Sequence, residues 1–584
     1  MNISLLSRPS AALAVACALA LPLLGACKEP DAPKPHPLPE TPEQPEPPPT
    51  PPVPEDWFGD EASKVITLEQ GWTPGEAEAY YTTPQGSEFM PYAIFLALEQ
   101  PDSEALFRDP RNMRRFRWLT GFTSPRNPDE LPIGMVKDGE ALGFTCAACH
   151  TNQINFKGTG IRVDGGPPLL DFVGFMEALV AALDATLKDE AKFDRLAARI
   201  HGGPPDDAKK AALRAQLEES YKQRKADIDM NKADTAGGYA RLDAFGRIFN
   251  RTLTLIESSN TNPSNGHVSY PALWDTPQHD YVQWDGFLEN AGLGALGRNV
   301  GEVVGVFGRI DVKPADAPKI GYASSVNVPN LLKLEGWVTT LTSPVWPEEV
   351  LPKLDADKVK AGAALYGEHC ERCHLPIDRA DPAREVIAQL YKLEVIKTDP
   401  VTATNIIRYG GTSGLLEGTK EKIDSGNKFG PQLLAFQALS NLVTGIIRNN
   451  AGGEAREQIG AMAKDSKATP RQGDLARDPK NPLASLLAYK ARPLNGVWAS
   501  APYLHNGSVP TLDDLLRPPA ERPREFWVGR REFDPVKVGY VSTEFEGGFK
   551  FDTTLPGNSN AGHEFGIELS DEERAALVEY LKSL

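Results

Sequence analysis

Cysteine is scarce in this chain, whose 584 residues include six cysteines, seven methionines and nine histidines. So few thiols cannot build the dense disulfide framework that holds many small exported proteins together. After residue 27 no apolar run approaches the ~20 residues that a membrane-spanning helix needs. Positive charge is also in deficit, since the formal net charge is −17. This balance argues against nucleic acid or an anionic lipid surface as the main partner.

Residues 1–27 have the form of a bacterial lipoprotein signal peptide. Arg8 supplies a positive charge, and the apolar segment 11–24 is too short for a typical transmembrane helix. The segment LLGACK then resembles the lipobox, whose cysteine is lipidated and becomes the new N-terminus. We therefore expect Cys27 to carry a lipid anchor. The alternative is ordinary signal cleavage that leaves Cys27 as a free thiol.

Residues 28–54 predict an extended linker, because 13 of these 27 residues are proline. Such a segment cannot form a packed core and favours polyproline II, at ~3.1 Å per residue. It would hold the folded part up to roughly 80 Å from the lipid. We expect an exported protein, periplasmic or at the cell surface, that is anchored by lipid alone. Lys28 after Cys27 favours the outer membrane, by resemblance to lipoprotein sorting patterns.

The motif C-x-x-C-H occurs twice and accounts for the cysteines beyond the first 27 residues. Its members are Cys146, Cys149 and His150, then Cys370, Cys373 and His374. Two cysteines at this spacing can form thioethers to the two vinyl groups on one porphyrin edge. The histidine that follows can then bind the iron as the proximal ligand. We therefore expect two covalently attached haem c groups.

Three other uses of the cysteines explain less of the pattern. Two disulfides would suit an exported chain, but His150 and His374 would then have no role. A zinc site of four cysteines would also leave both histidines idle. A C-x-x-C redox pair lacks a thioredoxin-like βαβ pattern around it. Haem attachment gives a role to both cysteines and to the histidine of each motif.

We predict a mainly α fold made of two class I cytochrome c-like haem domains with long loops. The first haem domain spans residues 55–345, and the second spans residues 346–584. Between about 178 and 232 the chain is rich in Ala, Leu, Lys and Glu, which predicts two amphipathic helices broken at HGGPPD. We expect this helical insertion to pack outside the first haem domain. No strand pattern is evident.

Capping residues predict two helices in the second domain. Asp355 is the expected N-cap of a helix that enters the second haem motif. Near the end of the chain, Ser570 and Glu573 form a capping box, and apolar residues follow at helical spacing. These two helices resemble the first and last helices of a class I cytochrome c.

Further segments go beyond a generic cytochrome, among them SYPALWDTPQHDYVQWDG, GALGRNVGEVVGVFG, APYLHNGS and GHEFG. With the paired haem motifs they resemble the diheme bacterial cytochrome c peroxidase / MauG superfamily, most of all its larger members similar to the rubber oxygenase RoxA. The resemblance covers most of residues 65–584. It implies that the N-terminal haem, bound by His150, reacts with an oxygen species. The C-terminal haem, bound by His374, would store or relay an electron.

The same resemblance implies a set of partners. Hydrogen peroxide or dioxygen would be the small-molecule oxidant. An electron-donor protein, such as a small cytochrome or a cupredoxin, would supply the electrons. Some relatives hold a calcium ion between the haems, so Ca²⁺ is a further candidate ligand. No nucleic acid partner is expected.

Two histidines compete to be the second axial ligand of the C-terminal haem. In class I cytochromes this ligand comes from the loop before the last helix, where the chain has NSNAGHEFG, so we favour His563. Ligation by two histidines should give a lower potential than ligation by histidine and methionine. His505 in PYLHNGS is the rival, and we expect it near the haem edge as an orienting partner. His267 and His279 are loop histidines, either of which could approach the first haem, and we expect a solvated role for both.

The residues above the N-terminal iron would decide the chemistry. By resemblance to the peroxidases, Glu302 is the distal acid–base and Trp284 is the bridge between the haems. A distal carboxylate can take a proton from hydrogen peroxide and return it to the leaving oxygen. The alternative roles are a charge on the helix surface for Glu302 and a core aromatic for Trp284. Arg298 and Asn299 are nearby candidates for orienting the peroxide or a haem propionate.

Two other functions remain open from the sequence. RoxA-like oxygenases have an apolar distal pocket, and Phe307 or Val303 could provide one here, with cleavage of an apolar polymer or lipid by dioxygen. A pure electron-transfer cytochrome would instead have two six-coordinate irons and no substrate chemistry. We favour a peroxidase-like oxidoreductase that reduces hydrogen peroxide at the N-terminal haem.

Overall fold

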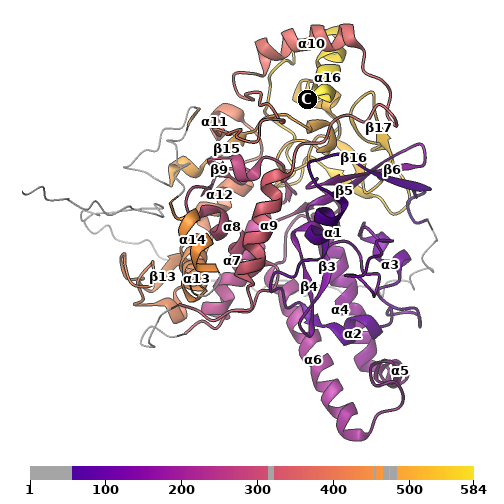
Figure 1. Ribbon diagram of the computed structural model, residues 1–584, viewed down its shortest axis with the longest axis vertical. Helices are drawn as coiled ribbons and strands as arrows, with labels where there is room; N and C mark the ends of the chain where they lie inside the picture. Colours follow the sequence, from indigo (N-terminus) through magenta and orange to yellow (C-terminus); the bar gives the residue numbers. More distant parts are fainter. Residues whose placement is uncertain (1–55, 314–320, 451, 453–454, 465–471, 474–482) are drawn as a thin grey trace, which may run out of the picture.

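A computed structural model describes residues 56–313, 321–450, 452, 455–464, 472–473 and 483–584 (Figure 1). The expected signal peptide, Cys27 and the proline-rich linker lie outside the described residues. None of the helices within the described ranges is long and apolar enough to cross a bilayer.

The helices are distributed over the whole described chain. The α-helices are α1 (Pro74–Thr82), α2 (Tyr92–Ala97), α3 (Pro110–Arg115), α4 (Phe172–Lys188), α5 (Glu190–His201), α6 (Asp207–Met230), α7 (Ala244–Ile256), α8 (Gly294–Gly305), α9 (Val328–Thr340), α10 (Ala356–His369), α11 (Leu393–Ile396), α12 (Val401–Arg408), α13 (Ala435–Asn449), α14 (Ala455–Met462), α15 (Leu512–Leu515) and α16 (Asp571–Ser583). Short 3-10 helices are η1 (Cys146–Ala148), η2 (Thr276–Gln278), η3 (Gly414–Leu416), η4 (Ala484–Leu486), η5 (Val497–Ala499) and η6 (Pro519–Glu521).

The strands are short and form small separate sheets of two or three strands. They are β1 (Lys64–Thr67), β2 (Met90–Pro91), β3 (Met135–Asp138), β4 (Ala141–Phe144), β5 (Thr151–Phe156), β6 (Thr159–Asp164), β7 (Arg241–Leu242), β8 (Val268–Ser269), β9 (Tyr281–Val282), β10 (Leu288–Glu289), β11 (Gln389–Lys392), β12 (Gly410–Thr412), β13 (Gln432–Leu434), β14 (Gln472–Gly473), β15 (Ala488–Ala491), β16 (Glu525–Val528), β17 (Phe533–Asp534), β18 (Gly539–Tyr540) and β19 (Phe549–Asp552). The three-stranded sheets have the orders β1-β6-β5, β2-β4-β3 and β14-β11-β15.

The prediction of a mainly α fold with two class I cytochrome c-like domains is wrong. The structure is 39% helical and 15% strand, and two such domains are not present as predicted. The clearest departure is at the first haem motif, which lies on the 3-10 turn η1 between strands β4 and β5. No long helix enters this motif, because the residues before it pair as β3 and β4.

The hairpin of β5 and β6 explains why strands follow the first motif. The strands pair antiparallel from Thr151↔Asp164 to Phe156↔Thr159, so Lys157 and Gly158 form a two-residue loop. Both loop residues have positive φ, of 48° and 77°, which is the conformation of a type I′ turn. Glycine at the second position permits this turn, and every residue of TNQINF except Phe156 is buried.

Helices α10 and α16 pair at one end of the molecule (Figure 1). They come close because α10 has glycine at the crossing, where a Cβ on Gly362 would lie 2.1 Å from the carbonyl oxygen of Ala576. Both predicted caps are confirmed. Asp355 accepts from the N–H groups of two first-turn residues, and Ser570 with Glu573 forms the capping box of α16. The pair positions the second haem motif at the C-terminal end of α10.

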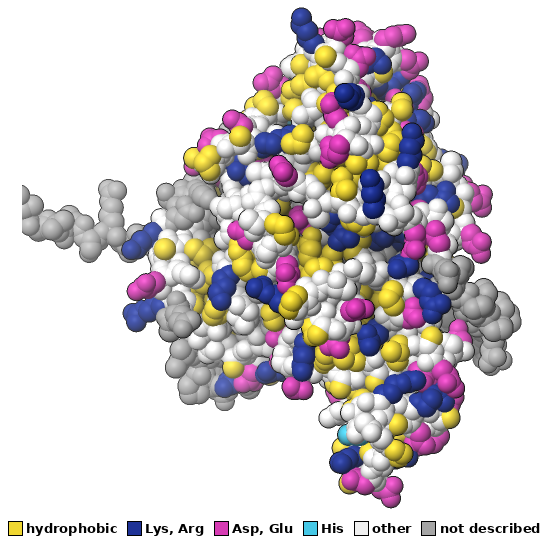
Figure 2. All heavy atoms as spheres, turned by 45° about the vertical axis from the view of Figure 1, so that its right-hand side comes forward, with side chains coloured by type: hydrophobic (Ala, Val, Ile, Leu, Met, Phe, Trp, Pro, Cys, Tyr) yellow, Lys and Arg dark blue, Asp and Glu magenta, His cyan; other side chains and the backbone are white. Residues whose placement is uncertain are grey.

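Helices α4, α5 and α6 occupy the segment predicted as a helical insertion, and they project at the opposite end of the molecule (Figure 1). The break predicted at HGGPPD falls after His201, where Gly202 adopts a left-handed φ of 71°. Lys/Arg and Asp/Glu side chains are mixed over this projecting end (Figure 2). The mixture is typical of a solvated helical surface.

Buried side chains join the two regions that were predicted as separate haem domains. Helix α13 packs against α7 and α8, and Leu442 and Ile446 share one core cluster with Phe249 and Val300. A second cluster unites Ile161 of β6 with segments near the C-terminus. The boundary at 345/346 stays a prediction, and the cores on its two sides are continuous.

A buried ion pair ties the N-terminal segment to the rest of the fold. Asp60 Oδ2 lies 2.7 Å from Arg117 Nη2, and the two side chains are 4% and 2% exposed. The backbone N–H of Arg531 also donates to Asp60, and the Arg117 guanidinium lies 4.0 Å from the ring centre of Phe58. Burial opposes ionisation of Asp60, but Arg117 and Arg531 together lower the pKa of its carboxyl below the usual value.

We predict that Asp60→Asn destabilises the fold by about 3–5 kcal/mol, because it leaves the Arg117 charge buried without a partner. The Asp60 carboxylate of the wild type contributes fully to stability at pH values above the pKa of aspartate in the unfolded chain, about 3.9. This contribution is lost as the pH falls through the lower pKa that Asp60 has in the folded protein. Denaturant unfolding at neutral and acidic pH measures both effects. Asp424→Asn, at an exposed pair with Arg448, is the control and should change stability little. Equal stability of the two variants would contradict the role of Asp60.

Candidate functional site

Two cavities lie next to the two C-x-x-C-H motifs. The larger, of about 310 Å³, is lined by Cys370, Cys373 and His374, and we call it the C-terminal cavity. The other, of about 190 Å³, is lined by Cys146, Cys149 and His150, and we call it the N-terminal cavity. Each predicted haem motif therefore faces an internal space of its own. None of these four cysteines forms a disulfide with another described residue.

The orientation of His374 in the C-terminal cavity is fixed by a backbone carbonyl. Its Nδ1 lies 2.7 Å from the carbonyl oxygen of Arg492, so Nδ1 carries the proton and donates it. Burial lowers the pKa of His374, which keeps the imidazole neutral. A neutral ring whose Nδ1–H is engaged has Nε2 available as a metal ligand.

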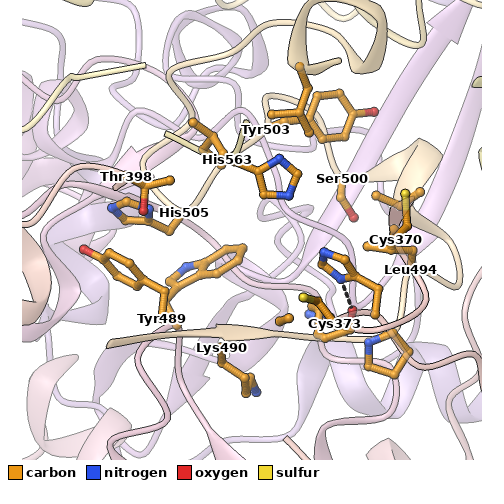
Figure 3. A pocket seen from close by; sticks show the side chains of 18 of the residues that line it. Cys370, Cys373, Thr398, Tyr489, Lys490, Leu494, Ser500, Tyr503, His505 and His563 are labelled. Carbon is orange, nitrogen blue, oxygen red and sulfur yellow. Dashed lines mark hydrogen bonds between the residues drawn. The ribbon is translucent and has the colours of Figure 1, made fainter. Parts of the chain in front are cut away.

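His563 lines the C-terminal cavity together with His374, and Figure 3 shows the His563 ring at this cavity. The two ring centres are 6.2 Å apart, with 55° between the ring planes. Metal–imidazole bonds of about 2 Å on either side of one iron would separate two ring centres by roughly 6 Å. Burial and the neighbouring His374 lower the pKa of His563 to about 3, so this ring is also neutral. The pair therefore fits the axial ligands of one iron.

The loop that carries His563 is held from both sides. His563 has a left-handed φ of 50°, a conformation in which non-glycine residues are strained. Its backbone N–H donates to Ile396, and Arg522 donates to its carbonyl oxygen at 3.2 Å and to that of Gly562 at 2.8 Å. These bonds hold the strained residue in place beside the cavity.

His505 lies at the side of the same cavity (Figure 3). Its ring stacks on Tyr489, with centres 3.9 Å apart and 24° between the planes. Burial lowers its pKa to about 3, and its Nε2 has no hydrogen-bond partner among the described residues. Stacking on Tyr489 orients the ring as a wall of the cavity, whereas His563 stands opposite His374.

The N-terminal cavity repeats the arrangement of the proximal histidine. His150 Nδ1 lies 2.9 Å from the carbonyl oxygen of Pro271, which again leaves Nε2 free. Burial lowers the pKa of His150 to about 4. Cys146 accepts a hydrogen bond from Gln85, and burial raises the pKa of the Cys146 thiol to about 11. The sulfur atoms and the imidazole of this motif line one cavity, as thioether attachment and iron ligation require.

Glu302 of α8 lines the N-terminal cavity. The residue has exposed surface because it faces this cavity, yet burial among its neighbours raises the pKa of its carboxyl above the usual range. Gln283 Nε2 donates to Glu302 Oε1 at 3.3 Å. The carboxylate is also near enough to the first motif to raise the pKa of Cys149 further, beyond the effect of burial.

Arg298 and Asn299 belong to a polar cluster on the same cavity. Arg298 donates to Glu335 Oε2 at 2.5 Å and to Asn290 Oδ1 at 2.8 Å, while Asn299 donates to Glu335 at 2.9 Å. Glu335 of α9 thus neutralises and orients the guanidinium. The predicted orienting residues lie on the cavity, but they are engaged with one another.

The two apolar alternatives above the N-terminal iron lie in different places. Phe307 lines the N-terminal cavity and packs against Phe89, with ring centres 4.7 Å apart. Its φ is 76°, so the chain turns sharply just after α8. Val303 is fully buried in the core cluster of α7, α8 and α9. Phe307 therefore shares this cavity with Glu302, and Val303 belongs to the core.

A dividing wall separates the two cavities. We define it by the residues that line both cavities, which are Tyr270, Ala272, Trp284, Lys490 and Arg492. Trp284 Nε1 donates to the carbonyl oxygen of Ser269 at 2.9 Å, and the carbonyl of Trp284 accepts from the backbone N–H of Lys490 at 2.7 Å. The indole is thus fixed between the cavities.

Several residues of this site were not anticipated from the sequence. Gln283, Glu335, Lys490 and Arg492 each lie on a cavity, and no short motif marks them. The expectation that His267 and His279 are solvated is wrong, because they are 4% and 2% exposed. A sequence signal for Lys490 and Arg492 was available in the segment LLAYKARP, where these two cations alternate with an apolar residue.

A calcium ion stays a prediction, since no group of three or more His, Cys, Asp or Glu among the described residues forms a metal site.

Comparison with known proteins agrees with a cytochrome. Residues 488–528 match the family model described as RoxA-like, cytochrome c-like, and a cytochrome c-like domain implies haem c. This segment includes β15 of the dividing wall and His505. The match indicates a haem-type oxidoreductase in general terms.

Two proteins of Sinorhizobium fredii (strain NBRC 101917 / NGR234) are similar to this chain. The uncharacterized protein y4iM is 26% identical over 339 residues, which cover 54% of this chain and 63% of that protein. The uncharacterized protein y4iJ is 32% identical over 595 residues, which cover 90% of this chain and 94% of that protein. The chain therefore belongs to the same family as y4iJ.

Proposed function

We propose that this chain is a diheme c-type cytochrome that acts as a peroxidase-like oxidoreductase and reduces hydrogen peroxide at its N-terminal cavity. The observation that carries the proposal is the position of Glu302, on the same cavity as the first haem motif. Two cavities, each with two cysteines and one carbonyl-bound histidine, support a cofactor in each. His150 and His374 would be the proximal ligands, and His563 would be the second axial ligand in the C-terminal cavity.

In the N-terminal cavity a bound haem would supply iron to bind the oxidant and to pass electrons. Glu302 would take one proton from hydrogen peroxide and return it to the leaving oxygen. Burial raises the pKa of this carboxyl toward neutral pH, where a group can both accept and return a proton. Gln283, which donates to Glu302 Oε1, would aim the carboxyl. Arg298 and Glu335 would form a neutral, hydrogen-bonded pair beside the site.

The C-terminal cavity would serve as an electron relay. His374 and His563, whose ring centres are 6.2 Å apart, would both hold this cofactor and would leave no place for a substrate between them. Trp284, fixed in the dividing wall by Ser269 and Lys490, would lie on the path of the electron. An electron-donor protein, such as a small cytochrome or a cupredoxin, would feed this relay. The haem regions 55–345 and 346–584 would follow this division of labour.

The location of the protein is a further part of the proposal. Lipidation of Cys27 after export would anchor the chain in the periplasm or at the cell surface, with the outer membrane favoured by Lys28. The linker 28–54 would hold the catalytic part away from the lipid. Bacterial haem c attachment outside the cytoplasm is compatible with this location.

A second candidate function is dioxygenase chemistry on an apolar polymer or lipid. The RoxA-like family match and the presence of Phe307 on the N-terminal cavity favour it. Phe245, Ile248 and Leu334 also line this cavity, so an apolar substrate would find apolar contacts. Products from polyisoprene and dioxygen, without peroxide turnover, would select this function over the first.

Two covalent haems are expected per chain, one high-spin and one low-spin. Intact mass and haem colour after denaturing extraction test attachment, because thioether bonds survive unfolding. Replacing both cysteines of either motif by alanine should remove one of the two additions. Cyanide should shift the spectrum of one haem only, since the other has both axial positions filled. A chain with no covalent haem would refute the proposal, and two low-spin haems that ignore cyanide would indicate an electron carrier.

Glu302→Gln should slow peroxide turnover by ~10²–10⁴-fold, because the amide cannot act as a base. The wild-type rate should fall as pH decreases through the Glu302 pKa, which burial places above the ordinary glutamate range. The variant should lose this acid limb. Glu140→Gln, at an exposed turn between β3 and β4, is the matched control. Turnover of E302Q at the wild-type rate would remove Glu302 from the mechanism.

Ligation of the C-terminal haem distinguishes His563 from His505. His563→Ala should convert the low-spin haem to high-spin and open it to cyanide, because His374 then lacks its opposite partner. His505→Ala should keep the low-spin signal, since its ring stacks on Tyr489 at the side of the cavity. Electron paramagnetic resonance of both variants, after covalent haem content has been checked by mass, gives the answer. The reverse pattern would assign the ligand to His505.

A further inference from the structure

Two cations of the dividing wall have no carboxylate partner. Lys490 Nζ lies 3.0 Å from His279 Nδ1 and 3.1 Å from the carbonyl oxygen of Tyr281. Arg492 donates to the carbonyl oxygens of Ala272 and Trp274, at 3.1 Å each. Within the described part of the chain, no Asp or Glu oxygen lies within 4.0 Å of either side chain's nitrogen atoms.

The surroundings make these two charges costly. Lys490 and Arg492 are half-buried, and both line the cavities. Burial, together with the nearby Arg492, lowers the pKa of Lys490 to about 7, although the more distant Asp280 and Asp285 oppose this. An enclosed charge is destabilising unless an opposite charge compensates for it. By contrast, the neighbouring Arg298 has Glu335 as its partner.

A third polar group on this wall also lacks a partner. His279 is 2% exposed and lines the N-terminal cavity, and its Nε2 has no hydrogen-bond partner among the described residues. Because Nδ1 accepts from Lys490, the proton of the neutral ring lies on Nε2, which is therefore a free donor. A lysine, an arginine and an imidazole N–H thus lie on one wall, where the two cations bond only to neutral acceptors and the imidazole N–H has no acceptor among the described residues. The set matches an anionic oxygen ligand.

The direction of Lys490 indicates which cavity it serves. Successive residues of a strand point to opposite faces, and β15 places Tyr489 and Lys490 side by side. Tyr489 stacks on His505 in the C-terminal cavity, whereas Lys490 leaves the strand on the other side (Figure 3). Its partner His279 lines the N-terminal cavity and does not line the other. The ammonium group therefore serves the N-terminal cavity.

We propose that Lys490, Arg492 and the Nε2–H of His279 form a carboxylate site for a propionate of the haem in the N-terminal cavity. This inference rests on the proposed function, since it needs a haem there. A haem c carries two propionate carboxylates and so supplies the anion that the wall lacks. The protein's own cations then provide the positive charge between the two cofactors. A Ca²⁺ ion is disfavoured at this wall, because two fixed cations would repel it.

The test compares Lys490→Met, Lys490→Arg and the control Lys333→Met in the full-length holoprotein. Lys333 is exposed on α9 and does not line either cavity. Spectroelectrochemical titration measures the midpoint potential of each haem, with EGTA, with added Ca²⁺ and with added acetate. K490M should shift the potential of the N-terminal haem to a more negative value, because a nearby cation stabilises the electron-rich reduced state. K490R and K333M should stay near the wild type.

Each outcome of this experiment decides between stated alternatives. Equal N-terminal potentials in K490M and the wild type, with both haems attached, would overturn the carboxylate site and leave the proposed function intact. A shift of the wild-type potential on calcium removal would place a metal ion there instead. A response to acetate in the wild type would show that the site takes an external carboxylate, which also overturns the inference. A wild-type chain without covalent haem would overturn both proposals.

Discussion

Two backbone carbonyl groups fix the rings on which this site depends. Pro271 and Arg492 accept the Nδ1–H of His150 and His374, so each imidazole presents only Nε2 to its cavity. Both carbonyls come from segments more than 100 residues away from the histidines that they bind. The orientation of each ring is therefore a product of tertiary structure, and the motif alone cannot supply it. If either carbonyl moved, the ring could turn and the cavity would lose its defined ligand direction.

The dividing wall connects these constraints. Its strand β15 places Tyr489 against His505 and Lys490 against His279 and the backbone of Trp284, and the residue after the strand, Arg492, places its carbonyl against His374. One short segment thus sets the position of groups on both cavities. This segment lies within the part of the chain that matches the RoxA-like, cytochrome c-like family. A change here would alter both halves of the site at once.

Local signals in the sequence predicted part of the structure well. Asp355 and the Ser570–Glu573 box cap the helices that the residues indicate, because capping depends on neighbours within one turn. The fold class was wrong at the first motif. There the two-residue Lys157–Gly158 turn joins TNQINF to β6 in a hairpin, and TNQINF has no alternation of polar and apolar residues that would mark it as a strand.

Only part of the site could be predicted from the sequence, for a related reason. Covalent attachment follows from residues within one turn, so the two motifs stand out. The burial of His279, the approach of Glu335 to Arg298 and the lack of a carboxylate beside Lys490 depend on contacts across distant segments. Contacts of this kind produce no periodic pattern and no fixed spacing in the sequence. The position of His563 in the loop before the last helix predicted it as the ligand opposite His374. The distance and angle between the two rings could be obtained only from the folded structure.

The late position of β15 in the chain has a consequence for maturation. A polypeptide is made from its N-terminus, so the cysteines at 146 and 149 emerge long before residues near 490. Until those residues arrive, the first cavity lacks one of its sides. If the first motif carries a haem, as proposed, its thiols would be accessible for attachment before the chain closes, and the segment near residue 490 would complete the dividing wall after the covalent step.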